Sequence, residues 1–407
     1  MGDLTNLLLN GIVEFPTSIP ASAPWPLGWF PFIGHFVYNI ISAMYGGGAV
    51  SYGVAIILFT IILKLILLPM DFLNKYFTKK NSNFMQKIKP EEDELKEQYA
   101  ADPIQLNRAR SALYKKHGYK MGGFCLFMFI NILVIAMVFF TVFGALRFVA
   151  DHNIREQARA VQGVYLEFYQ TDPIFDREGQ EFIDAINTAY NQHNVGFLWI
   201  QNVWVPDVPW SSSSTLSRTL YHRIGTTPEG FTAEQSAAML NSQYDAISAA
   251  INPSNNRDWN GLLILIILAG VTSWGSAYVN SKMMLKNRKK DDKPKEPKIE
   301  YSMRNTKDRS EVKVPTVDPV MMGRIMKIVL PIIMVYFTMI STAALAIYII
   351  MNSVLSTAIL FGLNYPVDKL LAWEEKRKKA RGDAPPDVEP GTINPHTKYF
   401  KNKRKKP

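Results

Sequence analysis

The sequence predicts an all-α polytopic membrane protein with five transmembrane helices, a cytoplasmic helical hairpin and an extended extracytoplasmic loop. Two observations lead to this prediction. Long uncharged apolar runs, of the roughly 18 or more residues that a membrane-spanning helix needs, alternate with strongly charged stretches along the 407 residues. Lysine and arginine are also concentrated in alternate loops, which is typical of loops that stay in the cytoplasm.

The N-terminal region, residues 1–51, is expected to lie outside the membrane core. Its segment LGWFPFIGHFVYNIISAMYGGG mixes aromatic residues, His35 and Asn39 with apolar residues, and it breaks at Gly46–Gly48. This suits a helix in the outer interface, joined by a flexible elbow to the first span. A sixth crossing is the alternative, but it conflicts with the charge pattern below. The N-terminus lacks the basic region of a secretory signal, so no cleaved signal is expected.

Five apolar runs are predicted to cross the membrane. The last two are almost continuous from Met326 to Leu363, which is too long for one crossing at about 1.5 Å per residue. A tight turn near residues 340–342 is therefore expected to divide them, and a single tilted or kinked helix is the alternative. The predicted spans are 52–70, 124–146, 260–280, 324–340 and 342–363.

Charge predicts the orientation of these spans. Lysine and arginine number eleven in residues 71–123, twelve in the linker 281–323 and twelve in the tail 364–407. By contrast, residues 148–260 have six arginines, no lysine and thirteen acids, and residues 1–63 have no basic residue. Because positive loops stay inside, the N-terminus and the long acidic loop are expected outside the cell, and the three basic segments in the cytoplasm.

The first basic segment, residues 71–123, is predicted to be an antiparallel helical hairpin. The two helices are separated at Ala100–Pro103. Asp102 is suited to cap the second helix, and Pro103 to occupy its first position, where a missing N–H costs nothing. The hairpin is expected to project into the cytosol.

A charged residue lies in the middle of the first apolar span. Lys64 lies in the stretch TIILKLILLPM, Thr60–Met70. A lysine near the bilayer centre costs about 2.5 to 3.5 kcal/mol on insertion scales. Its ammonium therefore either extends to the headgroups, about four residues away, or serves a water-filled site within the protein.

Neutral polar residues accompany Lys64 in the spans. They either glue the helices together or line a polar site. This set comprises Thr60, Asn131, Thr141, Thr272, Ser273, Ser276, Thr338, Ser341, Asn352, Ser353 and Ser356.

The residues that most enzymes need are missing from the spans. They contain no histidine, aspartate or glutamate, and the chain has one cysteine, Cys125, with no Walker loop or G-x-S-x-G motif. Catalysis is therefore not expected, and no metal or cofactor is expected either. A proton-driven transporter is disfavoured, because it normally uses carboxylates inside the membrane, whereas a passive channel stays open.

Short motifs along the chain resemble, in their order, the YidC/Oxa/Alb family of membrane-protein insertases. Lys64 stands where the family usually has arginine, and residues 211–259 form an insertion with no motif that we can interpret. The motifs are DP in the hairpin, ALYKKHG (112–118), GG (122–123), CLFMFIN (125–131), FLWI (197–200), PD (206–207), LAGVTSW (268–274), SKM (281–283) and MKIVLPIIM (326–334).

The resemblance implies an insertase and chaperone of the bacterial cytoplasmic membrane that works without a cofactor. A groove open to cytoplasm and lipid would accept the hydrated, often acidic tail of a nascent membrane protein, whose apolar segment then moves into the lipid. A transporter or channel is the alternative function. The expected groove residues are Lys64, Thr60, Asn131, Thr272, Ser273, Ser276 and Asn352.

The basic tail is expected to contact ribosomal RNA or anionic lipid through phosphates. A purely orienting role is the alternative. The resemblance favours ribosome contact, and it allows the Sec translocon as a further partner. The residues concerned are Lys376, Arg377, Lys378, Lys379, Lys403, Arg404, Lys405 and Lys406.

Overall fold

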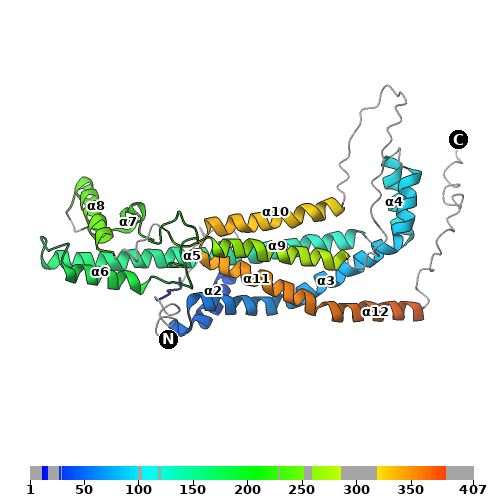
Figure 1. Ribbon diagram of the computed structural model, residues 1–407, viewed down its shortest axis with the longest axis horizontal. Helices are drawn as coiled ribbons and strands as arrows, with labels where there is room; N and C mark the ends of the chain where they lie inside the picture. The colour runs from blue at the N-terminus through cyan, green and yellow to red at the C-terminus, as the bar shows by residue number, and fades with distance from the viewer. Residues whose placement is uncertain are drawn as a thin grey trace, which may run out of the picture. The chain divides into compact units, whose positions relative to one another are not determined.

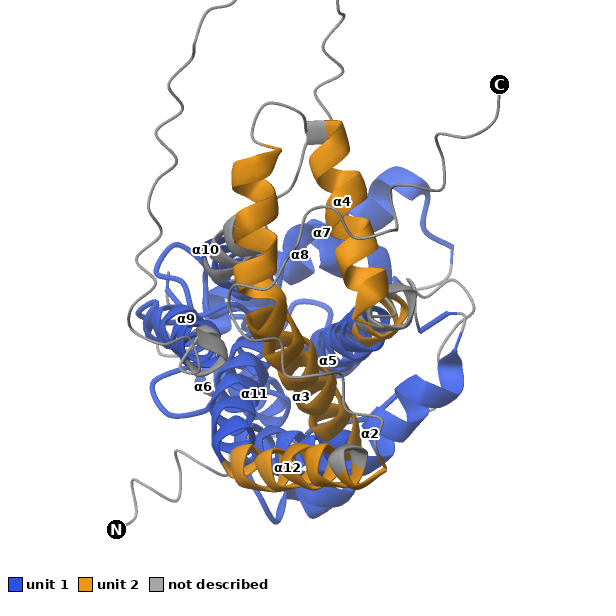
Figure 2. Cartoon of the chain, turned by 90° about the vertical axis from the view of Figure 1, so that its right-hand side faces the viewer, with its two compact units in different colours: residues 1–68, 132–361 blue, residues 69–131, 362–407 orange. Residues whose placement is uncertain are grey.

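A computed structural model describes residues 12–16, 27–28, 30–99, 103–117, 121–227, 230–251, 259–285 and 319–381. In this part of the chain the regular structure is helical, and the one β-type pairing is an isolated bridge between Phe197 and Ile200. The predicted all-α class is therefore confirmed for the described residues. The chain divides into two compact units (Figure 2), a first unit of residues 1–68 and 132–361 and a second unit of residues 69–131 and 362–407.

The helices follow the chain in a simple order (Figure 1). They are α2 (Pro31–Tyr45), the 3-10 turn η1 (Gly46–Gly48), α3 (Tyr52–Gln98), α4 (Pro103–Lys116), α5 (Met121–Thr171), α6 (Gln180–Gln192), α7 (Arg218–Ile224), α8 (Ala233–Ala250), α9 (Ile264–Leu285), α10 (Pro319–Ile340), α11 (Ala343–Gly362) and α12 (Asn364–Ala380).

Two helices are much longer than a membrane span. Helix α3 has 47 residues and α5 has 51, so each is about 70 Å or more long at about 1.5 Å per residue, against a hydrocarbon core of about 30 Å. The predicted spans 52–70 and 124–146 are thus only parts of these helices. Helix α3 continues into the predicted hairpin, and α5 continues through the first 25 residues, 147–171, of the segment expected to be an extended loop.

Three stretches have the length and composition to cross a membrane. They are Tyr52–Gln98, Phe129–Thr171 and Ala343–Arg377. Two shorter apolar helices, Ile264–Asn280 and Pro331–Ile340, correspond to the predicted third and fourth spans. The structure therefore has an apolar helix for each predicted span, while the count of five crossings stays a prediction.

The break expected near residues 340–342 lies between two helices. Helix α10 ends at Ile340 and α11 begins at Ala343. The Ala343 N–H donates to the Val205 carbonyl at 3.1 Å, and the Ala344 N–H to the Val203 carbonyl at 3.4 Å. The turn is thereby attached to the segment that follows the FLWI motif.

The glycine elbow is also explained by its backbone. Gly46, Gly47 and Gly48 have φ values of 59°, 65° and 101°. Residues with side chains rarely adopt this left-handed region. Glycines therefore allow the chain to end α2 and enter α3 within a few residues.

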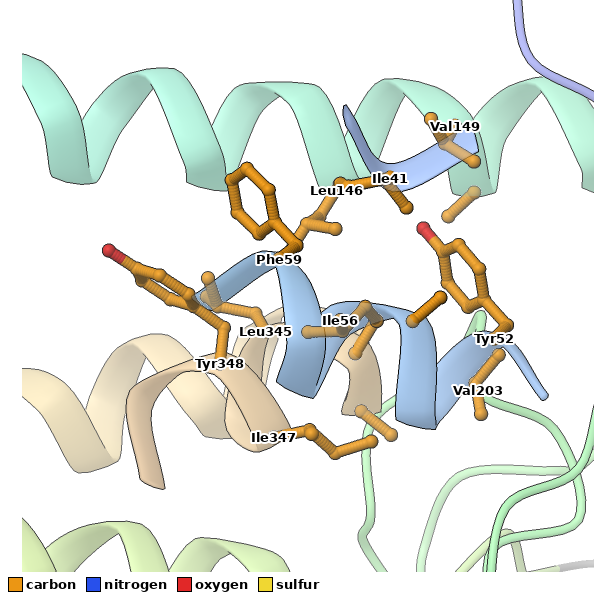
Figure 3. Close-up of a cluster of buried hydrophobic side chains, with 14 of the residues drawn as sticks. Ile41, Tyr52, Ile56, Phe59, Leu146, Val149, Val203, Leu345, Ile347 and Tyr348 are labelled. Atoms are coloured by element: carbon orange, nitrogen blue, oxygen red, sulfur yellow. The ribbon is translucent and has the colours of Figure 1, made fainter. Parts of the chain in front are cut away.

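The first unit contains an apolar cluster where α2, α3, α5 and α11 meet (Figure 3). Phe59 of α3 and Leu146 of α5 are fully buried in it. Other members are Ile41, Tyr52, Ile56, Val149, Val203, Leu345, Ile347 and Tyr348. This cluster joins elements from both ends of the sequence, so the helices pack as one body around it.

A second cluster is formed by the far half of α5 with α6, α7 and α8. We call it the external helical cluster, because the charge pattern predicts that this segment lies outside the cell. Its buried residues include Tyr165, Phe182, Ile186, Tyr221 and Ile247. The insertion 211–259 supplies α7 and α8, so it completes a packed core. The segment expected to be an extended loop is in this part a helical domain, because its short amphipathic helices bury their apolar faces against α5.

The second unit combines the C-terminal part of α3 with α4, the start of α5 and α12. Glu91 of α3 is buried and pairs with Lys116 at 3.2 Å and His117 at 2.8 Å. Glu92 pairs with Arg110 of α4 at 3.0 Å. These pairs make α3 and α4 an antiparallel hairpin, as the sequence predicts; the expected cap Asp102 lies outside the described residues.

Candidate functional site

The charged residue predicted for the site lies on α3 together with a buried hydroxyl. Thr60 is fully buried, and its hydroxyl donates to the Ile56 carbonyl at 2.7 Å. Lys64 is partly buried. Residues four apart lie on the same helix face, so the lysine is adjacent to Thr60 along α3.

Lys64 sits at the edge between two different faces of α3. Its neighbour Leu63 is buried in the apolar cluster at 8% exposure. On the other side, Leu65 and Ile66 are 62% and 51% exposed. A lysine at such an edge has an aliphatic stem that packs on the protein and an ammonium that can reach a polar surface.

Helices α9 and α11, which carry other polar residues of the predicted set, are joined by a hydrogen bond between two serines. The hydroxyl of Ser273 on α9 lies 3.2 Å from that of Ser353 on α11. Asn352 precedes Ser353, and Ser276 follows Ser273 by three residues, on the same side of α9. Both are partly buried. The structure therefore brings Ser273 and Ser353 together, and Ser276 lies on the same side of α9 as Ser273.

Several hydroxyl groups of the spans are satisfied within their own helices. Thr272 donates to the Leu268 carbonyl at 2.7 Å, and Ser356 donates to the Asn352 carbonyl at 2.6 Å. Such bonds allow a hydroxyl residue in an apolar helix at little cost. Thr272 and Thr60 thus fit a packing role as well as a groove.

Asn131 differs from the other predicted groove residues. It is buried at 9% exposure. It belongs to the second unit, whereas the other six residues belong to the first. Its participation in a common groove stays a prediction.

The apolar helices present an oily surface beside these polar groups. On α9, Ile267, Val271, Trp274 and Tyr278 are between 47% and 60% exposed. The rings of Trp274 and Tyr278 stack with centroids 5.5 Å apart. Contiguous apolar surface of this kind is unfavourable in water and is the normal outer face of a helix in lipid.

The basic tail residues fall on α12 and beyond it. Lys376 and Arg377 are exposed, and the Arg377 guanidinium lies 5.0 Å from the centroid of the Trp373 ring. Lys378 and Lys379 belong to α12, but the structure does not describe their side chains. Lys403, Arg404, Lys405 and Lys406 lie outside the described residues. The hydropathy of the sequence did not indicate that residues 364–380 form a helix.

The opposite face of α12 packs on α3, which sequence reasoning missed. Val367 and Leu371 are buried with Tyr76. The acids of α12 pair with lysines of α3: Asp368 with Lys79, Glu374 with Lys80 at 2.9 Å, and Glu375 with Lys87 at 2.7 Å. No periodic pattern could reveal pairs separated by almost 300 residues.

These contacts alter the ionisation of α3. Burial, and secondarily the nearby charge of Lys79, lowers the pKa of Lys75 to about 8, although Asp368 acts in the opposite direction. Burial and the hydrogen bond to Glu374 raise the pKa of Tyr76. The surface of α3 near Asp368 therefore holds a lysine whose charged form is destabilised by burial.

The PD motif proves to be a structural cap. The buried carboxylate of Asp207 accepts hydrogen bonds from the Leu262 N–H at 2.8 Å and the Leu265 N–H at 2.6 Å, at the start of α9. A carboxylate there satisfies free N–H groups and favours the positive end of the helix dipole. A Cβ on Gly261 would overlap this carboxylate, so a glycine is required beside it.

Comparison with known proteins gives one family and several relatives. Residues 43–369 match the profile of the family described as 60Kd inner membrane protein. Proteins named Membrane protein insertase YidC are similar over a shorter stretch. The one from Geobacter sulfurreducens is 33% identical over 122 residues, covering 30% of this chain and 21% of the relative.

Two other relatives with this name give similar values. The protein from Geobacter sp. is 37% identical over 123 residues, covering 30% of this chain and 21% of the relative. The protein from Magnetococcus marinus is 34% identical over 119 residues, covering 29% and 20%. The matched stretch therefore spans about a fifth of the length of these relatives.

Proposed function

The chain belongs to the 60Kd inner membrane protein family, and on this premise we propose that it is an insertase and chaperone for nascent membrane proteins. The relatives named above are membrane protein insertases. The family is not a class of catalytic enzymes, and insertion needs no covalent chemistry. The partners we propose are nascent membrane proteins and the lipids that receive them.

We propose five crossings with the N-terminus outside and the tail in the cytoplasm. The alternation of basic and acidic loops supports this orientation. The hydrogen bonds from Ala343 and Ala344 to the segment 203–205 also support it, since they attach the α10–α11 turn to a segment that the charge pattern assigns to the outside. α2 is then expected to lie at the outer interface.

The proposed mechanism depends on one observation. Lys64 lies in an apolar helix, at the boundary between the face of α3 that is buried in the apolar cluster and the face that is exposed. Holding a charge there is costly unless water or polar groups surround it. We propose that Lys64, with Thr60, Ser273, Ser276 and Asn352, wets a groove open to cytoplasm and lipid. Thr272 is proposed to complete it.

The proposed groove lowers the cost of moving a polar tail part of the way through the bilayer. Desolvating a polar or acidic segment in hydrocarbon costs several kcal/mol or more, and a hydrated groove with a positive charge reduces this cost. The apolar segment of the substrate then leaves the groove sideways into lipid. Its own hydrophobic transfer provides the free energy.

We further propose that the basic tail holds the chain near the ribosome. Lys376 and Arg377 are exposed, and the Arg377 guanidinium lies over the Trp373 ring. A guanidinium and an indole together suit stacking and phosphate contact. Binding to RNA phosphates releases counterions, so it should fall steeply with salt. The Sec translocon is a proposed further partner, for which only the family resemblance argues.

Reconstitution tests the proposed function. The purified chain in liposomes should insert a small membrane protein, detected as a protease-protected fragment. A transporter or channel would instead give ion flux without insertion, measured on the same vesicles with an entrapped dye. Insertion no better than in protein-free liposomes would contradict the proposal.

A further inference from the structure

A short N-terminal segment is held in extended form against three helices of the first unit. Residues 12–16 are described, and none of them is helical. Their burial alternates: Ile12 and Glu14 are exposed, Val13 is buried at 6%, and Phe15 is partly buried. This alternation is that of an extended strand with one face against the protein.

The contacts of this segment use its backbone. The Ile12 N–H donates to the Gln192 carbonyl at 2.5 Å, at the end of α6. The Val13 N–H donates to the Tyr45 hydroxyl of α2 at 3.2 Å. Three different elements thus supply the acceptors for three successive N–H groups, the third being Asn153 of α5.

The side chain of Asn153 forms two hydrogen bonds with the segment. Its Oδ1 accepts from the Glu14 N–H at 2.9 Å, and its Nδ2 donates to the Glu14 carbonyl at 2.8 Å. The side chain is fully buried, and a further bond from Nδ2 to the Val149 carbonyl at 2.8 Å holds it in place. An amide side chain held in this way binds the N–H and the carbonyl of one residue of an extended chain. This recognition depends on the backbone and not on the side chain of that residue.

The side chains of the segment add a simple preference. Val13 joins the apolar cluster, and the Phe15 ring lies 6.4 Å from that of Tyr45. Between them Glu14 faces His152, with 3.7 Å between the carboxylate and Nε2. The chemistry recognised is therefore an extended chain with an acidic residue between two apolar ones.

We propose that this is a binding site for extended segments of translocated protein, and that residues 12–15 are its resident ligand. The inference rests on the proposed function, because the proposed topology places the C-terminal ends of α2 and α6, and the part of α5 around Asn153, on the side where such segments emerge. The acidic character of the expected substrate tails matches the place of Glu14. An emerging chain would displace the resident segment and gain the same backbone bonds.

A labelled peptide of residues 10–17, added to the full chain in nanodiscs, tests the site. In the unaltered protein the tethered segment competes at an effective concentration of the order of millimolar, so the peptide should bind weakly. The variant Val13→Ser/Phe15→Ser keeps the backbone but loses the packing, and it should bind the peptide at least about tenfold more tightly. Ile12→Ser, at an exposed position, is the matched control.

The peptide itself provides the sharper control, since the protein is unchanged. Methylation of the Glu14 nitrogen removes the donor that Asn153 reads and should abolish binding. Methylation of the Phe15 nitrogen, for which the described residues provide no hydrogen bond, should leave it. Hydrogen exchange at the Ile12, Val13 and Glu14 amides of the protein verifies that the resident segment has been released.

The outcomes separate this inference from the proposed function. No gain in affinity on release, or equal binding of both methylated peptides, would show that the segment is only a structural strap. Insertion activity in liposomes together with either result would overturn the peptide site alone. Peptide binding without insertion would support the binding site and contradict the proposed insertase function.

Discussion

The external helical cluster and the α3–α12 contact are both expected to face water, but they are held together by different forces. The first buries a continuous set of apolar and aromatic side chains, among them Tyr165, Phe182 and Tyr221. The second buries only Tyr76, Val367 and Leu371 fully or nearly so, and surrounds them with ion pairs.

The difference separates a fixed part of the molecule from an adjustable one. Apolar burial is worth about 25 cal/mol per Å² and is not screened by salt, whereas exposed ion pairs contribute about 1 kcal/mol or less and are screened. The external cluster should therefore behave as a permanent domain. The helix α12, which carries the basic residues proposed to meet the ribosome, should dock reversibly.

The largest effect is expected from the external cluster. Phe182 is 1% exposed and packs against Tyr165, Phe168 and Phe175 with ring centroids 5.1 to 6.1 Å apart. Phe182→Ala should lower the free energy of unfolding of this cluster by about 3 to 5 kcal/mol, measured by hydrogen exchange of α6. Phe231→Ala, at a 40% exposed position, is the control. A loss below about 1 kcal/mol for Phe182→Ala would contradict the comparison.

A smaller effect is expected at the α3–α12 contact. A double-mutant cycle of Lys80→Met and Glu374→Gln should give a coupling of about 1 kcal/mol, because this pair is partly buried and shares Tyr76. The exposed pair Lys87–Glu375 should couple by about 0.5 kcal/mol or less. Exchange of the α12 amides reports both values, and equal coupling in the two pairs would refute the account of docking.

A pH-dependent effect is expected on α3. The pKa of Lys75 is lowered to about 8 from an ordinary 10.5, so below pH 8 both folded and unfolded chains hold the proton and the cost is fully present. Between pH 8 and 10.5 the folded state releases its proton first, and stability should rise with pH. Lys75→Met should remove this rise, whereas Lys369→Met, at an exposed position, should keep it. An unchanged pH slope in Lys75→Met would argue against a partly buried charge there.

Sequence alone predicted the features that hydropathy and turn chemistry determine. The apolar runs, the break at Ser341–Thr342, the Gly46–Gly48 elbow and the start of α4 at Pro103 all follow from local composition. The continuation of α3 and α5 beyond the spans did not, because hydropathy measures how much of a helix suits lipid and carries no information on where the helix ends.

Long-range packing explains what else was missed. The external helical cluster is formed by short helices whose apolar residues come together only in the folded chain. From its composition, α12 would be taken for a solvated charged segment, because its ion pairs with Lys79, Lys80 and Lys87 exist only in the folded chain. At the candidate site, residue type identified Lys64. It could not show that the Thr60 hydroxyl is already bonded to the Ile56 carbonyl.

The central claim is that the charge of Lys64 wets a groove for acidic substrate tails. It is tested most directly by insertion of a membrane protein with an acidic translocated tail, in cells depleted of their own insertase, with each variant matched for its level in the membrane. Lys64→Arg should support normal insertion, and Lys64→Leu should reduce it about tenfold, a loss of about 1.4 kcal/mol. Lys282→Leu, which removes the exposed lysine of α9 beside Tyr278, should have no effect. Normal insertion by a well-expressed Lys64→Leu variant would contradict the account.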